Sequence, residues 1–565
     1  MTGKNYIKNT VILFISMAIT KIVGALFKIP LANLLGGTGM GYFSTAYGLY
    51  SPIFALTAAG VPTVMMRITA QSLAAGRNEY ASAVKKNALV LFSAIGLAGT
   101  LAVFVFAAPF AEYIACSPES TAAIMCISPA VMLCCTACVL RGYYEGMSDV
   151  LPSAAAAVAE ATSRAVSGLA MAYAVLIRAR SCAETGEPFF GRMIVSTDEA
   201  LPYAAAGAVL AVSVSELCGL ITLIISDRRH SRLCVPCRGK FGRREIYLRL
   251  LKEAAPIAAS SLVMNCVSFA DLLTVTRSLG SSAEINAGYF TEKFSEILPS
   301  CGGIDGLPNF MYGSYTGIAM SLFMLIPSFA GMTEKTSSPA IAAAWEKRDI
   351  PMLSESITTQ LRACSLIGCP ACCGAAALAE PILRMLYRSR AAEVSVCLDS
   401  FVILCLGGMF MVLSGAMFGI FQAVGKAHIP LVLMICSVAV KLILNPILIS
   451  VPCLNIAGAA VSSVAGYVVM TIGACIALHR IVPRGARVLR AVFPAALCGG
   501  ACGISARLVY ELLPQGESSI FRVAAAIASG MFIYGILLIL TGNFRAGGII
   551  KRKIEKNLKN PLKNK

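Results

Sequence analysis

Apolar segments long enough to cross a membrane recur along the whole chain. Of its 565 residues, 57% are hydrophobic and 13% are charged, and the mean hydropathy is +0.76. A soluble domain carries about 25% charged residues. A helical span needs about 20 apolar residues, whereas a barrel strand needs about 10. Because these segments are of the longer kind, the sequence predicts an all-α integral membrane protein.

We count about fourteen transmembrane helices. The eighth is the least regular, since the segment from Glu292 to Tyr315 is rich in Gly, Pro and Ser, which interrupt helices. The expected centres of the helices are Ile22, Phe54, Leu97, Met132, Ser167, Val212, Val263, Met320, Cys369, Met409, Val438, Val464, Cys498 and Ile527.

The basic residues predict how these helices are oriented, because Lys and Arg gather in cytoplasmic loops. With the N-terminus inside, the even-numbered connections are basic, above all the sixth, from Arg228 to Lys252. The ninth, from Arg384 to Arg390, is the exception. We expect a multi-pass protein of a cell membrane with both termini in the cytoplasm. The net charge of +18 is then explained by loops that face membrane lipids, and it needs no nucleic-acid partner.

Two stretches of the chain look related. The stretch RGYYEGMSDVLPSAAAAVAEATSRA begins at Arg141, and FGIFQAVGKAHIPLVLMICSVAVKL begins at Phe418. Aligned without gaps, they match Arg164 with Lys441. Parallel repeats of this kind are typical of transporters that move one half against the other around a central site. We expect two six-helix lobes in parallel pseudo-repeat around a central cavity, followed by two C-terminal helices.

This interpretation divides the chain into five parts. They are an N-lobe (residues 1–230), a basic cytoplasmic linker (231–247), a C-lobe (248–480), the last two helices (481–545) and a basic cytoplasmic tail (546–565).

The first predicted helix carries two lysines, Lys21 and Lys28. A charge at the middle of a membrane costs roughly 2.5–3.5 kcal/mol on insertion scales. Seven residues apart, the two lysines fall almost on one face of a helix. We expect that face to look into a polar cavity. The alternative is that both side chains extend to the headgroup layers.

Other charged residues in apolar segments are candidates for substrate and ion binding. The substrate candidates, with the two lysines, are Arg164, Lys441 and Asn445, and the coupling-ion candidates are Asp271 and Glu160. Two alternatives remain open. Glu160 and Arg164, spaced i,i+4, would neutralise each other on one helix. Asp271 would form a buried ion pair with a lysine of the first span.

The sequence shows little sign of metal or nucleotide chemistry. His230, Cys234 and Cys237 form a short cluster, but a zinc site needs a fourth ligand, and none is nearby. A phosphate-binding G-x-x-x-x-G-K-[ST] loop is absent, and so is an arrangement of nucleophile and base. We therefore expect no metal, no cofactor and no enzymatic activity. The role of the His–Cys cluster stays open.

Three motifs resemble a known family. They are TKIVGALFKIPLANLLGGTGMGYFSTAYGLY, AAGVPTVMMRITAQ and LRGYYEGMSDVLPSAAAAVAEATSR. They resemble the stage V sporulation protein B and polysaccharide-flippase branch of the multidrug/oligosaccharidyl-lipid/polysaccharide transporter superfamily. The resemblance implies two six-helix lobes, alternating access and a lipid-linked oligosaccharide as cargo. It also implies movement of that cargo from the cytoplasmic to the outer leaflet.

Lipid II flippases, which are related to this branch, have essential basic residues in the first span, where Lys21 and Lys28 lie here. They also have an arginine in the eighth span, whereas the comparable segment NFMYGSYTGIAM has none. This departure leaves open how a diphosphate would be held.

We expect a flippase for undecaprenyl-diphosphate-linked oligosaccharide or peptidoglycan precursors, working as a monomer. Its drive would be H⁺, Na⁺ or the membrane potential. One alternative is a multidrug and toxin extrusion pump, for which an acidic cavity is expected. The other is a membrane glycosyltransferase or ligase. That enzyme would need a large outer loop with catalytic carboxylates, and the loop from Ile177 to Leu201 is the one place for it.

Overall fold

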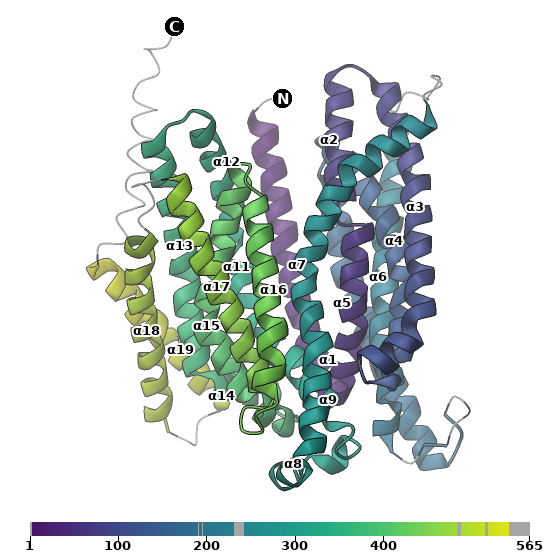
Figure 1. Ribbon diagram of the computed structural model, residues 1–565, viewed down its shortest axis with the longest axis vertical. Helices are drawn as coiled ribbons and strands as arrows, with labels where there is room; N and C mark the ends of the chain where they lie inside the picture. Colours follow the sequence, from purple (N-terminus) through teal and green to yellow (C-terminus); the bar gives the residue numbers. More distant parts are fainter. Residues whose placement is uncertain are drawn as a thin grey trace. The chain divides into compact units, whose positions relative to one another are not determined.

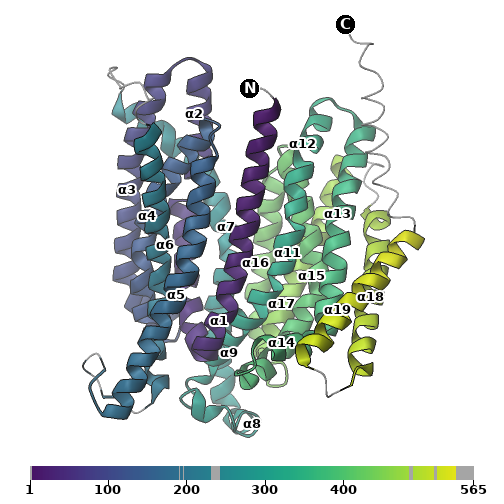
Figure 2. The ribbon, with the colours of Figure 1, turned by 180° about the vertical axis from the view of Figure 1, so that it is seen from behind.

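The computed structural model describes residues 3–189, 191, 193–194, 196–230, 242–482, 488–514 and 518–541 (Figures 1 and 2). Every regular element among these residues is a helix, which confirms the all-α prediction. The helices are α1 Gly3–Thr57, α2 Val61–Ala74, α3 Asn78–Pro109, α4 Thr121–Gly146, α5 Leu151–Thr185, α6 Leu201–His230, α7 Arg243–Ile285, α8 Ala287–Lys293, α9 Leu307–Ser314, α10 Ser321–Phe323, α11 Leu325–Ala330, α12 Met332–Glu346, α13 Ile350–Ala377, α14 Ala379–Leu386, α15 Ala391–Ala423, α16 His428–Ile449, α17 Ala457–Ile481, α18 Val488–Leu512 and α19 Ser519–Leu540.

Eleven helical segments of the described chain are long and apolar enough to cross a membrane. The number is twelve if α13 and α14, which meet at a bend of 78°, form one span. All fourteen predicted centres lie in helical segments. The first two share one segment, Ile15–Ala74, and the seventh lies in α7. The fold is thus that of a polytopic helical membrane protein.

The ends of several helices follow from local sequence. α13 begins after Asp349, whose side chain accepts a hydrogen bond from the backbone N–H of Met352 at 3.0 Å. α19 begins in the same way after Ser518. Such caps stabilise a helix by about 1 kcal/mol, because they satisfy a backbone donor that has no partner within the helix. α5 ends at Gly186, whose φ of 70° is the left-handed conformation that glycine adopts without strain.

α1 consists of two helices joined at Gly36, where φ is 65° and ψ is −171°. A side chain at Gly36 would collide with the guanidinium of Arg390, since an added Cβ lies 2.6 Å from its Nη1. Arg390 donates to the carbonyl of Asn33 at 3.0 Å, and the N–H of Gly37 donates to Glu393 at 3.2 Å. These contacts satisfy backbone groups that the break leaves without helical partners.

The chain packs into two compact units. The first spans residues 1–322, 389–400 and 434–462, and the second spans 323–388, 401–433 and 463–565. In the first unit, α4 packs between α3 and α6, and α5 packs on α6 and α1 (Figures 1 and 2). In the second unit, α18 packs on α13 and α19.

The lobe boundaries predicted from the repeat stay a prediction, because the two units are defined by packing and not by the repeat. Most of the predicted linker, the predicted tail, Cys234 and Cys237 lie outside the described residues, as does the side chain of His230.

Candidate functional site

A pocket of about 410 Å³ opens within the first unit. Its walls come from α1, α5, α7, α9 and the π-helical turn Tyr315–Met320. Charged, amide, hydroxyl and aromatic side chains line it together. They are Phe27, Lys28, Phe43, Ser44, Tyr47, Ser51, Arg164, Asn265, Tyr312 and Thr316. The pocket therefore offers cationic groups, hydrogen-bonding groups and aromatic faces to one ligand.

Lys28 enters this pocket from α1. Its ammonium donates to the hydroxyl of Ser321 at 3.2 Å, and that hydroxyl donates to the carbonyl of Thr316 at 2.9 Å. The Thr316 hydroxyl lies 2.8 Å from both the Ser44 hydroxyl and the carbonyl of Tyr312. The lysine thus contacts a hydroxyl that is itself bonded to the backbone of the π-helical turn. A single hydroxyl contact leaves donors of the ammonium available to a ligand, because lysine carries three.

Lys21 lies two turns earlier on α1, with an exposed side chain. It is not among the residues that line the pocket. The structure therefore brings only one of the two lysines of the first span to this pocket.

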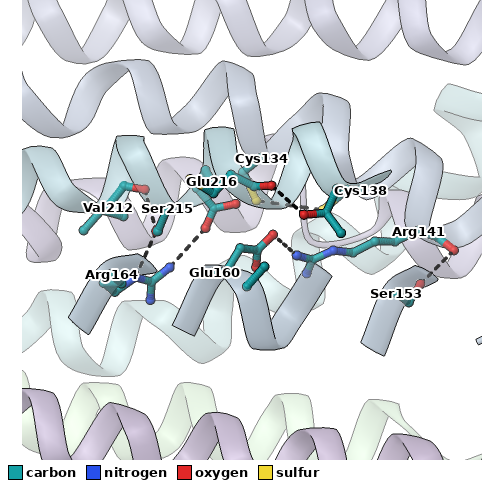
Figure 3. Close-up of polar contacts among 12 residues, drawn as sticks. Cys134, Cys138, Arg141, Ser153, Glu160, Arg164, Val212, Ser215 and Glu216 are labelled. Atoms are coloured by element: carbon teal, nitrogen blue, oxygen red, sulfur yellow. Dashed lines mark hydrogen bonds and ion pairs between the residues drawn. The ribbon is translucent and has the colours of Figure 1, made fainter. Parts of the chain in front are cut away.

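Arg164 reaches the pocket from α5 and lies at the end of a buried row of ionic groups (Figure 3). Its Nε donates to Ser215 at 3.2 Å, and its Nη2 donates to Glu216 at 3.2 Å. Glu160 is paired with Arg141 of α4. The i,i+4 pair that the sequence suggested is therefore replaced by two ion pairs that join α5 to its neighbours.

Lys441 and Asn445 lie in a different cluster, with Asp271. The ammonium of Lys441 donates to Asp271 at 2.6 Å, and the two side chains are 1% and 7% exposed. The Asn445 amide donates to the other oxygen of Asp271 at 3.2 Å and to Thr274 at 2.7 Å. Asn445 also accepts from Ser462. This cluster joins α7, α16 and α17, and the partner of Asp271 is a lysine of the eleventh predicted span, not of the first.

Sequence reasoning missed several residues at or beside the pocket, among them Glu216, Tyr312 and Ser321. Glu216 had a signal, because it is a lone carboxylate in an apolar segment, as Asp271 is. The other two had none, since hydroxyl groups are common in membrane helices and only packing brings these two to the pocket.

Metal ligands do not gather in the part of the chain that the structure describes. In it, no group of three or more His, Cys, Asp or Glu side chains could hold a metal ion.

The chain matches the model of the family described as polysaccharide biosynthesis protein over residues 6–345, and the MatE family model over residues 314–447. It is 23% identical to stage V sporulation protein B of Bacillus subtilis (strain 168), over 96% of each chain. The structure is similar to the inward closed conformation of the lipid II flippase MurJ, with a TM-score of 0.68 and 11% identity, over 95% of this chain and 100% of that one. It is also similar to the inward-facing conformation of a multidrug resistance MATE transporter, with a TM-score of 0.58 and 17% identity, over 82% of this chain and 98% of that one. At these identities the two solved structures show the fold alone.

Proposed function

The chain belongs to the polysaccharide biosynthesis protein family, and from this premise we propose that it is a flippase for a lipid-linked saccharide. The motif resemblance is confirmed by the family match, and the structural matches are to membrane transporters. The proposed cargo is an oligosaccharide or peptidoglycan precursor on undecaprenyl diphosphate. It would move from the inner to the outer leaflet by alternating access, with both termini of the protein in the cytoplasm.

One observation carries this proposal: Lys28 and Arg164 line the same pocket. A diphosphate headgroup that leaves water loses a large hydration energy, so it needs cationic partners along its path. Lysine binds phosphate as a point charge, and arginine binds it with two parallel hydrogen bonds. Two cations in one pocket suit an anionic headgroup and disfavour a cationic drug.

The rest of the lining suits a saccharide. Ser44, Thr316 and Asn265 supply hydroxyl and amide groups, and Tyr47 and Tyr312 supply aromatic faces. The volume of about 410 Å³ lies within the range of about 300–1,000 Å³ that is usual for ligand pockets. The polyprenyl tail would stay in the bilayer while the headgroup passes through the protein. The membrane potential would contribute about 2.3 kcal/mol per charge per 100 mV.

An efflux pump for cationic compounds is the second candidate. The match to the MatE family model over residues 314–447 and the similarity to a MATE transporter favour it. The two candidates call for ligands of opposite charge, so one reconstituted system can decide between them.

The test is transport by the purified protein in proteoliposomes. Labelled polyprenyl-diphosphate saccharide is placed in the liposomes, and its exposure on the far leaflet is followed beside the movement of a cationic dye. We expect lipid exposure without dye transport. Lys28→Ala should lower the rate by at least about tenfold, because a charge-assisted hydrogen bond is worth roughly 1.5–3 kcal/mol.

The matched control is Arg180→Ala. Arg180 is an exposed cation on α5 that pairs with exposed Glu184 at 3.1 Å. It does not line the pocket, so its loss should leave transport unchanged. Dye transport without lipid exposure would establish the efflux pump instead. Full activity of Lys28→Ala would remove the pocket from the transport path.

A further inference from the structure

Glu216 of α6 is a buried carboxylate that is only half satisfied. Its side chain is 8% exposed, and one oxygen accepts from Arg164 at 3.2 Å (Figure 3). The other oxygen is buried and has no hydrogen-bond partner among the described residues. A buried carboxylate charge is costly unless a cation or several donors stabilise it, and Arg164 is the cation that contacts Glu216 among the described residues.

Arg164 can pair either with Glu216 or with an anionic ligand in the pocket. Its side chain is 32% exposed and lines the pocket, while its guanidinium also donates to Glu216 and Ser215. These two contacts occupy the Nε–Nη2 edge of the guanidinium. A phosphate that binds this edge with two parallel hydrogen bonds therefore competes with Glu216 for it. When the ligand takes the stronger hydrogen bonds, Glu216 loses the one ion-pair partner that the described residues give it.

The charged and titratable groups around Glu216 do not supply a replacement. Arg141, the other cation of the cluster, is already paired with Glu160. Glu160 is a second buried carboxylate that interacts with Glu216. Its negative charge makes an unpaired charge on Glu216 still less favourable. The groups that interact electrostatically with Glu216 are Tyr47 and Tyr50 from α1, Cys134 and Arg141 from α4, and Glu160 and Arg164 from α5.

From this geometry we infer that Glu216 carries a proton with each anionic cargo. When a phosphate oxygen of the ligand accepts from Arg164, a hydronium ion of the cavity water transfers one proton to Glu216, so one O–H bond of hydronium breaks as one O–H bond forms on the carboxylate. When the ligand leaves, Arg164 returns and the proton is released. The inference rests on the proposed function and adds one proton to it, which is taken up with each bound anion and released when that anion leaves.

The sequence suggested two other carboxylates for coupling, Glu160 and Asp271. The cation that pairs with each of them does not line the pocket. Glu160 is paired with Arg141, which does not line the pocket. Asp271 is paired with Lys441, which is 1% exposed. Of the ion pairs that the described residues form, the one between Arg164 and Glu216 is therefore the one in which ligand binding and protonation of the carboxylate occur together.

The test is calorimetry of ligand binding to the full chain in detergent. The probe is farnesyl diphosphate, a short polyprenyl diphosphate, titrated in two buffers that differ in heat of ionisation. Near neutral pH, the wild type should take up about one more proton per bound ligand than Glu216→Gln. The dissociation constant of the wild type should rise by up to about tenfold per pH unit, and that of Glu216→Gln should rise less. Protons that the probe itself exchanges on binding contribute equally to both proteins. They therefore cancel when the proton uptake of the two proteins is compared.

Glu160→Gln is the matched control, because it makes the same isosteric change in the same cluster and should keep the extra proton. Equal proton uptake by the wild type and Glu216→Gln would overturn the inference. The proposed function would still stand after that result, provided that Lys28→Ala weakens the binding of farnesyl diphosphate. Absence of any farnesyl diphosphate binding by the wild type would contradict both.

If Glu216→Gln does not fold, infrared difference spectroscopy of the wild type replaces it. Ligand addition should then produce the carbonyl band of a protonated carboxylic acid. A spectrum without that band would overturn the inference.

Discussion

Arg164 and Lys441 occupy matching positions of the sequence repeat, yet their surroundings differ. Arg164 is 32% exposed, lines the pocket and contacts Glu216 at 3.2 Å. Lys441 is 1% exposed and contacts Asp271 at 2.6 Å. Asn445 donates to the second oxygen of Asp271, whereas the second oxygen of Glu216 has no such donor among the described residues. One ion pair is closed, because it is buried and both of its carboxylate oxygens have donors, and the other can be opened by a ligand.

The comparison suggests that the two ion pairs have different roles, one in stability and one in binding. A closed pair fixes helices, because its charges have no alternative partner and their separation leaves a buried charge. An open pair can exchange partners at low cost, because water or ligand replaces the lost contact. Asp271 and Lys441 then stabilise the contact of α7 with α16, and Arg164 and Glu216 take part in binding.

The largest effect should follow from opening the closed pair. Asp271→Ala leaves the ammonium of Lys441 buried without its carboxylate, so the free energy of unfolding should fall by about 3–5 kcal/mol. Reversible denaturation in mixed micelles, or thermal unfolding of the purified protein, measures this change. Glu216→Ala is the comparison variant, since Arg164 can be hydrated from the pocket, and it should cost less. A larger loss for Glu216→Ala would reverse the roles that we assign.

A smaller effect, on binding and not on stability, should follow from Arg164→Gln. The variant keeps a hydrogen-bonding side chain but loses the charge, so affinity for farnesyl diphosphate should fall by about tenfold to a hundredfold, the equivalent of roughly 1.5–3 kcal/mol. Calorimetry gives the affinity, and thermal unfolding shows whether the fold is kept. Unchanged affinity in a folded variant would place the ligand elsewhere.

The smallest effect should come from replacing both members of the closed pair by apolar residues. The double variant Asp271→Leu/Lys441→Met removes two charges together, and such exchanges change stability by about 1 kcal/mol or less, or even stabilise. Its transport rate in proteoliposomes should stay within about twofold of the wild type, because in this account the pair only holds helices together. Loss of transport in a stable double variant would assign the closed pair a role in coupling.

The helical architecture could be predicted from sequence because hydropathy acts over lengths of about 20 residues and needs no tertiary information. The centres at Leu97 and Val212, for example, lie within α3 and α6. The break in α1 could not be located, because the contacts of Gly36 with Arg390 depend on a segment more than 350 residues away.

The site could be predicted only in part, for a physical reason. The lysines of the first span stood out because charges are costly in a membrane. The partners of the charged residues could not be predicted, because sequence spacing identifies neighbours on one helix only. The packing of different helices pairs Arg164 with Glu216 and Asp271 with Lys441. The repeat aligns Arg164 with Lys441 as basic residues but contains no information on their burial.

The most direct measurement is the affinity of the purified protein for farnesyl diphosphate beside that of the double variant Lys28→Ala/Arg164→Gln. If the pocket holds an anionic headgroup through these two side chains, the wild type binds the diphosphate and the double variant loses at least about a hundredfold in affinity, roughly 2.7 kcal/mol. Equal affinities of two folded proteins would contradict the account, and so would a wild type that binds a cationic dye in preference to the diphosphate.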